Sequence, residues 1–407
     1  MKRLAAILAG MLAGSVASAG GPLLVRTNGQ PFIWSTAAPI QYRTDNGPLS
    51  ASVGEAAARS RVEGMFAVWQ NVASASISYN RAGFISSVAG FSGGDVDTAE
   101  EYNAVEGDCN AGNQSPVIYD AAAEIFIAAG VDETSVIGFA GPCAFDTTNG
   151  RIISGQAVMN GLFQDGTDSP VIDQDPAEFD AAFIHEFGHF SGLDHSQVNV
   201  ECANLGCGVD DRAGLPTMFP FLVTDQQGTL SIDDVAWISK LYPAAGGSGF
   251  TATHGIITGT VYFSDGESHA QLVNVVARRV NNPATVGIDE GRTTAASAVS
   301  GQRFRSFNGN PINEPNDQPL GPFGNQAPGD IGFYEIPLPA GSYHITVESV
   351  DPQFIDGSSV GGQLRIAMPG SAPPSIGPVT VTAGATSSGK DVVLIDTPPR
   401  FDQFEGP

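Results

Sequence analysis

The chain has 407 residues and a formal net charge of −25 at pH 7, from 18 lysines and arginines against 43 aspartates and glutamates. A surface of this sign keeps a protein soluble and repels nucleic acid and anionic membranes, so the composition argues against nucleic-acid partners. The roughly 388 residues beyond a predicted leader are enough for two or three domains.

The first 19 residues have the pattern of a secretory signal peptide. Lys2 and Arg3 form a basic start, residues 4–16 form an apolar run, and residues 17–19 (Ala-Ser-Ala) form a small-residue cleavage site. The apolar run is too short to span a bilayer, and no later segment is long enough. Loss of the two basic residues would change the net charge from −25 to −27. We expect a chain that starts near Gly20, works in the medium or the periplasm, and has no transmembrane segment.

Residues 20–245 mix predicted helices and strands. Residues 55–72 carry an apolar stripe at helical spacing, which predicts a helix packed on a core and consists of Ala58, Val62, Met65, Phe66 and Trp69. Residues 40–43, 77–79 and 117–119 predict short strands, and Arg151–Asn160 predicts a longer one. Residues 232–242, with Ser231 as N-cap, predict a closing helix.

The sequence HEFGHFSGLDH begins at His185 and has a spacing typical of zinc sites. His185 and His189 lie one turn apart on the same face of a helix. Gly192 can take the positive φ that ends the helix, and His195 then returns as a third ligand. A fourth tetrahedral position remains for water, as catalytic zinc requires. Glu186 is placed to accept a proton from that water. The pattern predicts a catalytic Zn²⁺ site.

Acidic residues gather before the predicted zinc helix. Asp175 can cap the helix, and Pro176 suits its first position. Four carboxylates could supply the hard oxygen ligands that Ca²⁺ prefers, from Asp165, Asp168, Asp173 and Asp175. A solvated acidic loop explains the same residues equally well, so a structural calcium ion and a plain loop both stay open.

The extended motif is the signature of the metzincin metallopeptidases. Met218, 23 residues after His195 in PTMFP, resembles the methionine turn that metzincins carry beneath the metal, although a lone methionine can simply fill a core. Ser196 after the third histidine and the stretch Thr229–Pro243 (TLSIDDVAWISKLYP) resemble matrixins in particular. The resemblance covers roughly residues 25–245 and is strongest in the last sixty.

The matrixin resemblance implies an α+β fold of the zincin type, with a twisted mixed sheet, three main helices and an antiparallel edge strand beside the cleft. Arg151–Asn160 is expected to be that edge strand. The resemblance further implies a zinc-dependent endopeptidase whose protein or peptide substrate pairs with the strand around Ile153–Val158. The pocket for the side chain after the cut would be walled by Pro220, Phe221 and Leu222. Matrixins often have Pro-x-Tyr here, so this pocket departs from the family.

Three aspartates have two interpretations each. Asp194 would orient a ligand histidine by analogy with matrixins, or it is a turn residue. Asp233 or Asp234 could pair with a mature N-terminal amine, as an aspartate of the last matrixin helix can. An exposed carboxylate that favours the helix dipole is the alternative.

The cysteines of a secreted chain favour disulfides. Their order in the sequence favours the pairs Cys109–Cys143 and Cys202–Cys207, and buried free thiols are the alternative. No CxxC pair is present, so a cysteine metal site is not expected. No cysteine precedes Cys109, so inhibition by a prodomain cysteine is not expected either.

Residues 246–250 predict a glycine-rich linker to an all-β region at 251–397, followed by a tail at 398–407. The predicted strands are Ile256–Phe263, Leu272–Arg278, Ile331–Ile336, Tyr343–Val350, Val379–Thr382 and Asp391–Ile395. Residues 305–330 predict a long loop. The series resembles carboxypeptidase-regulatory-like, transthyretin-type β-sandwiches.

The sequence leaves three functions open. The favoured one is a secreted zinc endopeptidase that acts on extracellular proteins. The second is another zinc hydrolase, or a peptidase with one narrow, self-directed target. The third is an adhesion protein whose β-sandwich binds a cell-surface or matrix ligand. An inert metal site would usually lose the glutamate, so Glu186 favours an enzyme.

Overall fold

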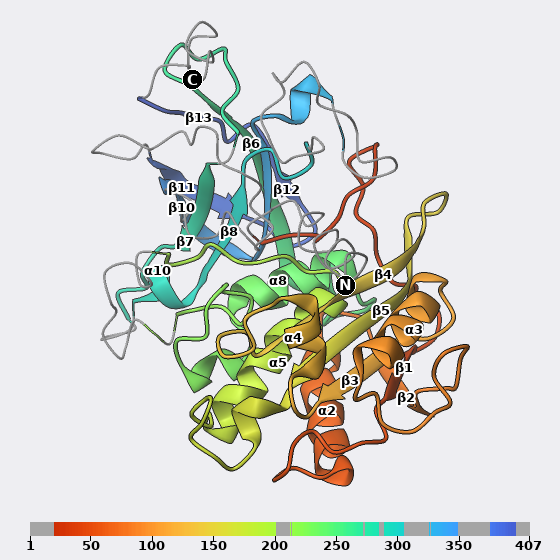
Figure 1. Cartoon of the computed structure of the whole chain (residues 1–407). Helices are drawn as coiled ribbons and strands as arrows, with labels where there is room; N and C mark the ends of the chain where they lie inside the picture. The colour runs from red at the N-terminus through yellow and green to blue at the C-terminus, as the bar shows by residue number, and fades with distance from the viewer. Residues whose placement is uncertain are drawn as a thin grey trace, which may run out of the picture.

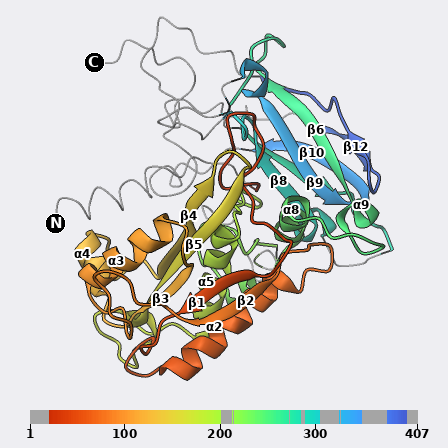
Figure 2. The same ribbon diagram turned by 90° about the vertical axis from the view of Figure 1, so that its right-hand side faces the viewer.

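The computed structural model describes residues 20–200, 212, 214–271, 273–284, 289–304, 325, 327–348 and 375–395. The predicted signal peptide, Cys202, Cys207 and the tail lie outside the described residues, as does most of the predicted 305–330 loop. The described residues form two β-rich regions that pack against each other (Figures 1 and 2). None of their helices is long and apolar enough to cross a membrane.

The first region is built on a five-stranded sheet in the order β2-β1-β3-β5-β4. Its strands are β1 (Ile40–Thr44), β2 (Tyr79–Phe84), β3 (Pro116–Asp120), β4 (Gly138–Asp146) and β5 (Arg151–Asn160). The pairs β1–β2, β1–β3 and β3–β5 are parallel, whereas β4 runs antiparallel to β5. The sheet is therefore mixed, and its antiparallel strand lies at an edge.

The edge strand is β4, so the expectation that residues 151–160 form the edge is wrong. β5 pairs with β3 on one side and with β4 on the other, which makes it an internal strand. The sequence of β4, GFAGPCAFD, contains two glycines and a proline, which are depleted in strands and hide it from pattern analysis. An edge position tolerates Pro142, which precedes a shift in the strand register.

Helices cover both faces of this sheet. α2 (Glu55–Gln70) buries the predicted stripe, and it packs with α5 (Pro176–Phe190) on one face. α3 (Ala99–Asn110) and α4 (Glu124–Ala129) pack on the other face (Figure 2). The alternation of β3 fits this arrangement, because Val117 and Tyr119 join the α2–α5 core while Ile118 joins the core under α3.

Aromatic contacts fix α5 in place. Phe187 stacks on Phe66 of α2, with ring centroids 4.0 Å apart. The Trp69 indole N–H donates to the carbonyl of Ile184 at 2.8 Å, and the Trp34 indole donates to the carbonyl of Phe190 at 2.8 Å. Both bonds hold the backbone of the helix that carries two of the predicted ligands.

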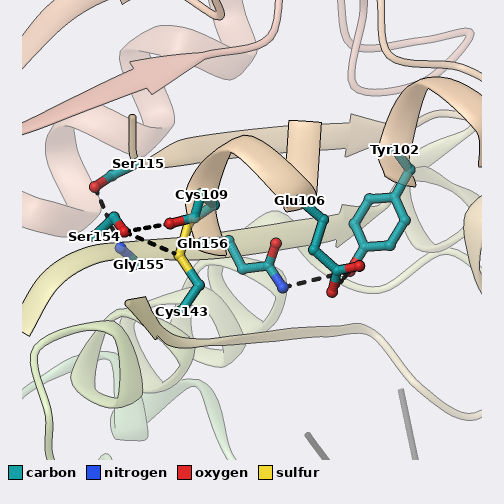
Figure 3. Close-up of a disulfide and its surroundings, with 8 residues drawn as sticks. All are labelled: Tyr102, Glu106, Cys109, Ser115, Cys143, Ser154, Gly155 and Gln156. Carbon is teal, nitrogen blue, oxygen red and sulfur yellow. Dashed lines mark hydrogen bonds between the residues drawn. A yellow bond between two sulfur atoms is a disulfide. The ribbon is translucent and has the colours of Figure 1, made fainter. Parts of the chain in front are cut away.

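A disulfide joins α3 to the edge strand, between Cys109 and Cys143 (Figure 3). The two Cα atoms are 5.9 Å apart, and the Ser154 hydroxyl of β5 donates to the carbonyl of Cys109 at 2.6 Å. Tyr102 and Glu106 of α3 lie beside it, and the Tyr102 hydroxyl donates to the Glu106 carboxylate at 3.1 Å. This pairing agrees with the predicted one.

In the second region, the described residues between 254 and 395 form mainly strands. Its elements are β6 (His254–Tyr262), β7 (Asn274–Arg279), β8 (Ala295–Val299), β9 (Phe333–Pro339), β10 (Gly341–Glu348), β11 (Ser375–Val381), β12 (Thr386–Ser387) and β13 (Val392–Val393), with the short helix α10 (Glu290–Thr293). One sheet has the order β11-β10-β7-β8. In the other, β6 pairs antiparallel with β9 and parallel with β12 and β13. The strand β8 was not predicted from the sequence.

The two regions share a buried interface centred on α8 (Ile232–Leu241), which contacts β8 and β9 (Figure 2). The buried Trp237 indole donates to the carbonyl of Ser297 at 3.1 Å, and Lys240 pairs with Glu335 at 2.7 Å. The predicted linker, residues 246–250, leads into a short helix, α9 (Phe250–Thr253), which directly precedes β6.

Candidate metal centre

The helix α5 begins and ends where the sequence predicts. The Asp175 side chain accepts a hydrogen bond from the backbone N–H of Ala177 at 2.8 Å, and Pro176 is the first helical residue. After Phe190 the chain turns at Gly192, whose φ of +88° is in the region that favours glycine. This turn brings His195 back toward the helix.

The three predicted ligand histidines converge. Their ring centroids are 4.7 Å apart for His185 and His189, 5.1 Å for His185 and His195, and 4.6 Å for His189 and His195. One ligand atom from each ring lies within 4.8 Å of the others. Among the residues that the structure describes, this is the only group of three or more His, Cys, Asp or Glu side chains with such spacing.

Hydrogen bonds determine which nitrogen faces the centre. His185 Nδ1 is 2.8 Å from the carbonyl oxygen of Thr217, and His189 Nδ1 is 2.9 Å from that of Leu193. A carbonyl oxygen only accepts, so each Nδ1 carries the proton and each Nε2 presents a lone pair. These carbonyls belong to backbone groups, and no side-chain pattern in the sequence signals them.

The Nε2 atoms of His189 and His195 are only 3.1 Å apart. His189 Nε2 has no proton to donate, so this short contact holds either an N–H of His195 directed at the lone pair of His189 or, when both Nε2 atoms are unprotonated, a cation between the two lone pairs. Zinc–nitrogen bonds of about 2.0–2.1 Å in a tetrahedron would separate two ligand nitrogens by about 3.3 Å, close to the observed spacing. The residues present fit a zinc ion.

Burial keeps these imidazoles neutral. Desolvation is the main cause that lowers the pKa of His185 to about 3 and that of His189 to about 4. The pKa of His195 falls well below its usual value, first through desolvation and then through the other two rings. A neutral imidazole is the form that binds a metal.

Glu186 links the centre to the edge strand. Its carboxylate accepts a hydrogen bond from the backbone of Ala140 in β4, and burial raises its pKa to about 8. It is not part of the converging ligand group. Glu186 therefore follows the first candidate ligand in the sequence without being a ligand itself, and its carboxylate faces β4.

Met218 packs against α5 at Gly188, between the two helical histidines. A Cβ atom added at Gly188, between the two helical histidines, would lie 2.2 Å from the Met218 sulfur and 2.9 Å from Trp69. Glycine at position 188 therefore lets α5 rest directly on Met218. Thr217, which precedes Met218 in the sequence, supplies the carbonyl that orients His185.

The two aspartates of α8 are buried, so the interpretation as exposed helix-start carboxylates is wrong. Asp234 accepts from the backbone N–H groups of Thr217 at 2.8 Å, Met218 at 3.0 Å and Ser231 at 2.7 Å. It thus holds the backbone of Thr217 and Met218. Asp233 accepts from the backbone N–H of Ser297 at 2.9 Å, in the second β region. Burial, which no local pattern shows, decides both roles.

Asp194 has a hydrogen bond of the turn type. Its carboxylate accepts from the backbone N–H of His195 at 2.7 Å, and the side chain is buried. His195 Nδ1 is buried without a hydrogen-bond partner among the described residues. The ring of the third ligand is therefore held by its loop and not, like the other two, by a carbonyl at Nδ1.

The segment after Met218 reaches the surface. Phe221 is 40% exposed, whereas Pro220 and Leu222 are half-buried. The carboxamide of the buried Gln227 donates to the carbonyl of Phe221 at 2.9 Å and accepts from the N–H of Val223 at 2.7 Å. This segment has a defined shape next to the centre, which the sequence alone does not show.

The acidic loop before α5 satisfies its own backbone. Asp173 accepts from the N–H groups of Asp165 and Gly166, both at 2.9 Å, while Asp175 caps the helix. Asp165, Asp168, Asp173 and Asp175 do not form a converging ligand group in the described chain. The arrangement gives the calcium hypothesis no support.

Residues 20–23 run alongside the loop that leads to His195. Leu23 N–H donates to the carbonyl of Gly192 at 2.8 Å, and Asp194 N–H donates to that of Gly21 at 3.0 Å. Gly20 N–H donates to the carbonyl of His195 at 2.5 Å. Sequence analysis missed this pairing because the segment has no strand pattern of its own.

The chain matches no protein-family model and no curated protein. Among solved structures it is similar to a leucine-rich repeat protein from Bacteroides thetaiotaomicron VPI-5482, with 18% sequence identity and a TM-score of 0.17. The match covers 35% of this chain and 12% of that protein. A likeness of this size carries no argument about fold or function.

Proposed function

We propose that this chain is a secreted, zinc-dependent endopeptidase that hydrolyses peptide bonds in extracellular proteins. The observation that carries the proposal is the convergence of three neutral imidazoles at a spacing that fits a zinc ion, with Glu186 next to the first of them in the sequence. The mixed sheet with an antiparallel edge strand supports the zincin-like assignment made from the motif.

His185, His189 and His195 would hold the zinc. When bound there, zinc supplies a Lewis acid that polarises a carbonyl and lowers the pKa of a water molecule. Glu186 would accept the water proton and pass it to the leaving amine. Its raised pKa reflects burial, and a proton carrier works best when its pKa lies near the working pH.

The edge strand β4 would bind the substrate backbone. β5 occupies one side of β4, and the other side is a sheet edge that can accept a further strand. The Ala140 backbone, which bonds Glu186, lies on this strand. A peptide paired with β4 would therefore run past the proposed proton acceptor. This assignment replaces the expected pairing with Ile153–Val158, which is internal to the sheet.

The decisive test replaces Glu186 with Gln, which keeps the size of the side chain but removes its basicity. We expect zinc content equal to that of the wild type and a loss of about 10²–10⁴-fold in the cleavage of an unfolded protein. His189→Ala should instead lose the zinc itself. Cleavage by Glu186→Gln at the wild-type rate would contradict the proposed mechanism.

Secretion is a separate part of the proposal. It rests on the pattern of residues 1–19 and agrees with the Cys109–Cys143 disulfide, because disulfides persist in oxidising compartments. N-terminal sequencing of the protein recovered from the medium or the periplasm should give Gly20 as the first residue. A full-length chain confined to the cytoplasm would refute this part alone.

A further inference from the structure

The loop that carries the third histidine continues between the two β regions. Residues 196–199, called here the third-ligand loop, are Ser196, Gln197, Val198 and Asn199. Each is at most 1% exposed, although three of the four are polar. Buried polar groups persist where they are hydrogen-bonded, so the partners of this loop reveal what holds it.

The partners lie on the four-stranded sheet of the second region. The Asn274 amide of β7 donates to the carbonyl of Gln197 at 2.9 Å, and the N–H of Gln197 donates to the Ser297 hydroxyl of β8 at 3.3 Å. The Arg278 guanidinium donates to the side-chain oxygen of Asn199 at 2.7 Å.

Apolar packing adds to these bonds. Val198 of the third-ligand loop forms a small buried cluster with Val276 of β7 and Ala295 of β8. The cluster lies between the polar contacts, so the loop meets the sheet through a continuous buried surface.

The alternation of side chains along β7 shows that one face of the sheet contacts the third-ligand loop. Asn274, Val276 and Arg278 are every second residue of β7, so they share one face. The intervening residues Val275 and Ala277 belong to the main core, on the opposite face. The outward face of a sandwich sheet usually meets water, but here it is covered by the third-ligand loop.

One ion pair and the hydrogen bonds of Asn199 hold the loop on the sheet. Arg278 also donates to the Glu348 carboxylate of β10 at 2.7 and 3.1 Å, so its fork joins the sheet and the loop. Asn199 has a φ of +60°, which asparagine tolerates better than most residues. Its amide donates to the carbonyls of Gly214 at 2.9 Å and Arg292 at 3.4 Å. The side chain of Asn199 is bonded at both ends.

We propose that the outward face of β7 and β8 positions the third metal ligand, with Asn274, Arg278 and Ser297 acting on His195 through the third-ligand loop. His185 and His189 are preorganised by α5, whereas His195 lies on a loop, which would lose more freedom on binding a metal. A loop already ordered by the sheet avoids that loss. The second β region is then part of the metal centre. This inference rests on the proposed function, because it assumes that the histidines bind zinc.

The test compares two full-length variants at one position. Asn199→Gly removes the amide and permits the left-handed backbone, whereas Asn199→Asp keeps the oxygen that accepts from Arg278 and loses the two hydrogen bonds to the carbonyls of Gly214 and Arg292. Zinc affinity is measured by competition with a chromophoric chelator at a temperature where circular dichroism shows every variant folded. We expect Asn199→Gly to weaken zinc binding about 10–100-fold, as loss of groups that orient ligands does. Asn199→Asp should weaken it as well, because a carboxylate cannot donate to the carbonyls of Gly214 and Arg292.

A matched control separates positioning from general stability. Val381→Ala removes a buried side chain of β11, in the same sheet but outside the contacts of the third-ligand loop. It should lower the melting temperature and leave the zinc dissociation constant unchanged. Equal weakening in Val381→Ala and Asn199→Gly at similar melting temperatures would overturn the positioning role, as would wild-type affinity in Asn199→Gly. Failure of the wild type to bind zinc would overturn the proposed function as well.

Discussion

The two β regions bury their sheets in different ways. The five-stranded sheet has helices on both faces, and its one antiparallel edge lies beside the candidate centre. The β11-β10-β7-β8 sheet packs one face in the main core and turns part of the other toward the third-ligand loop. The first region thus supplies two ligands on a rigid helix, while the second supports the loop that carries the third. The site belongs to both.

The largest expected effect tests the rigidity of the first region. Phe187→Ala removes a fully buried ring that stacks on Phe66 beneath the ligand helix. We expect a loss of about 3–5 kcal/mol in the free energy of unfolding, measured by denaturant titration. Phe221→Ala, at a 40% exposed position, should change it by no more than about 0.5 kcal/mol. If the two variants lost similar amounts of unfolding free energy, the buried contacts of Phe187 would not be what holds α5 in place.

A second prediction concerns the edge strand. Replacing Cys109 and Cys143 together with alanine should lower the free energy of unfolding by about 2–4 kcal/mol, because the disulfide restricts the unfolded chain. Hydrogen exchange should quicken in β4 and α3, which the disulfide joins, and remain unchanged in β7 and β10. If hydrogen exchange quickened equally in both β regions, the two regions would unfold as one unit, and the disulfide would not act on the first region alone.

The smallest effect is a pH dependence at the joint between the regions. Burial first, and then the charge of Asp234, raise the pKa of Asp233 to about 7. A folded pKa above the unfolded value near 4 means that this group favours folding at low pH and opposes it increasingly as the pH rises from about 4 through 7.

Asp233→Asn should remove this dependence while the side-chain oxygen still accepts from Ser297. Between pH 5 and pH 8 the wild type should lose about 2–3 kcal/mol of stability relative to the variant. Melting curves across this range provide the measurement. A difference that is constant with pH would show that Asp233 does not titrate in this interval.

Local patterns predicted those parts of the structure that depend on local physics. The stripe from Ala58 to Trp69 is the buried face of α2, and Asp175 caps α5 as expected. The spacing of His185 and His189 predicted their convergence, because a helix repeats every 3.6 residues. Gly192 takes the positive φ that the return of His195 requires.

Features that depend on distant partners could not be predicted in this way. β4 has glycine and proline where strands usually have β-branched residues, and only its pairing with β5 makes it a strand. β8 is a short run of small residues with no strand pattern in the sequence. It is buried in part because the third-ligand loop packs against its Ala295. The backbone carbonyls of Thr217 and Leu193, which orient two ligands, have no side-chain signature.

The sequence by itself determined the histidine cluster and the helix that presents two of its members, since residue type and helical period act over one or two turns. The tertiary structure decided which strand is the edge, how the Asp233 and Asp234 carboxylates are used, and what supports His195. Those outcomes depend on burial and on hydrogen bonds between residues far apart in the chain. Such contacts form only when the whole fold brings them together, so no local pattern encodes them.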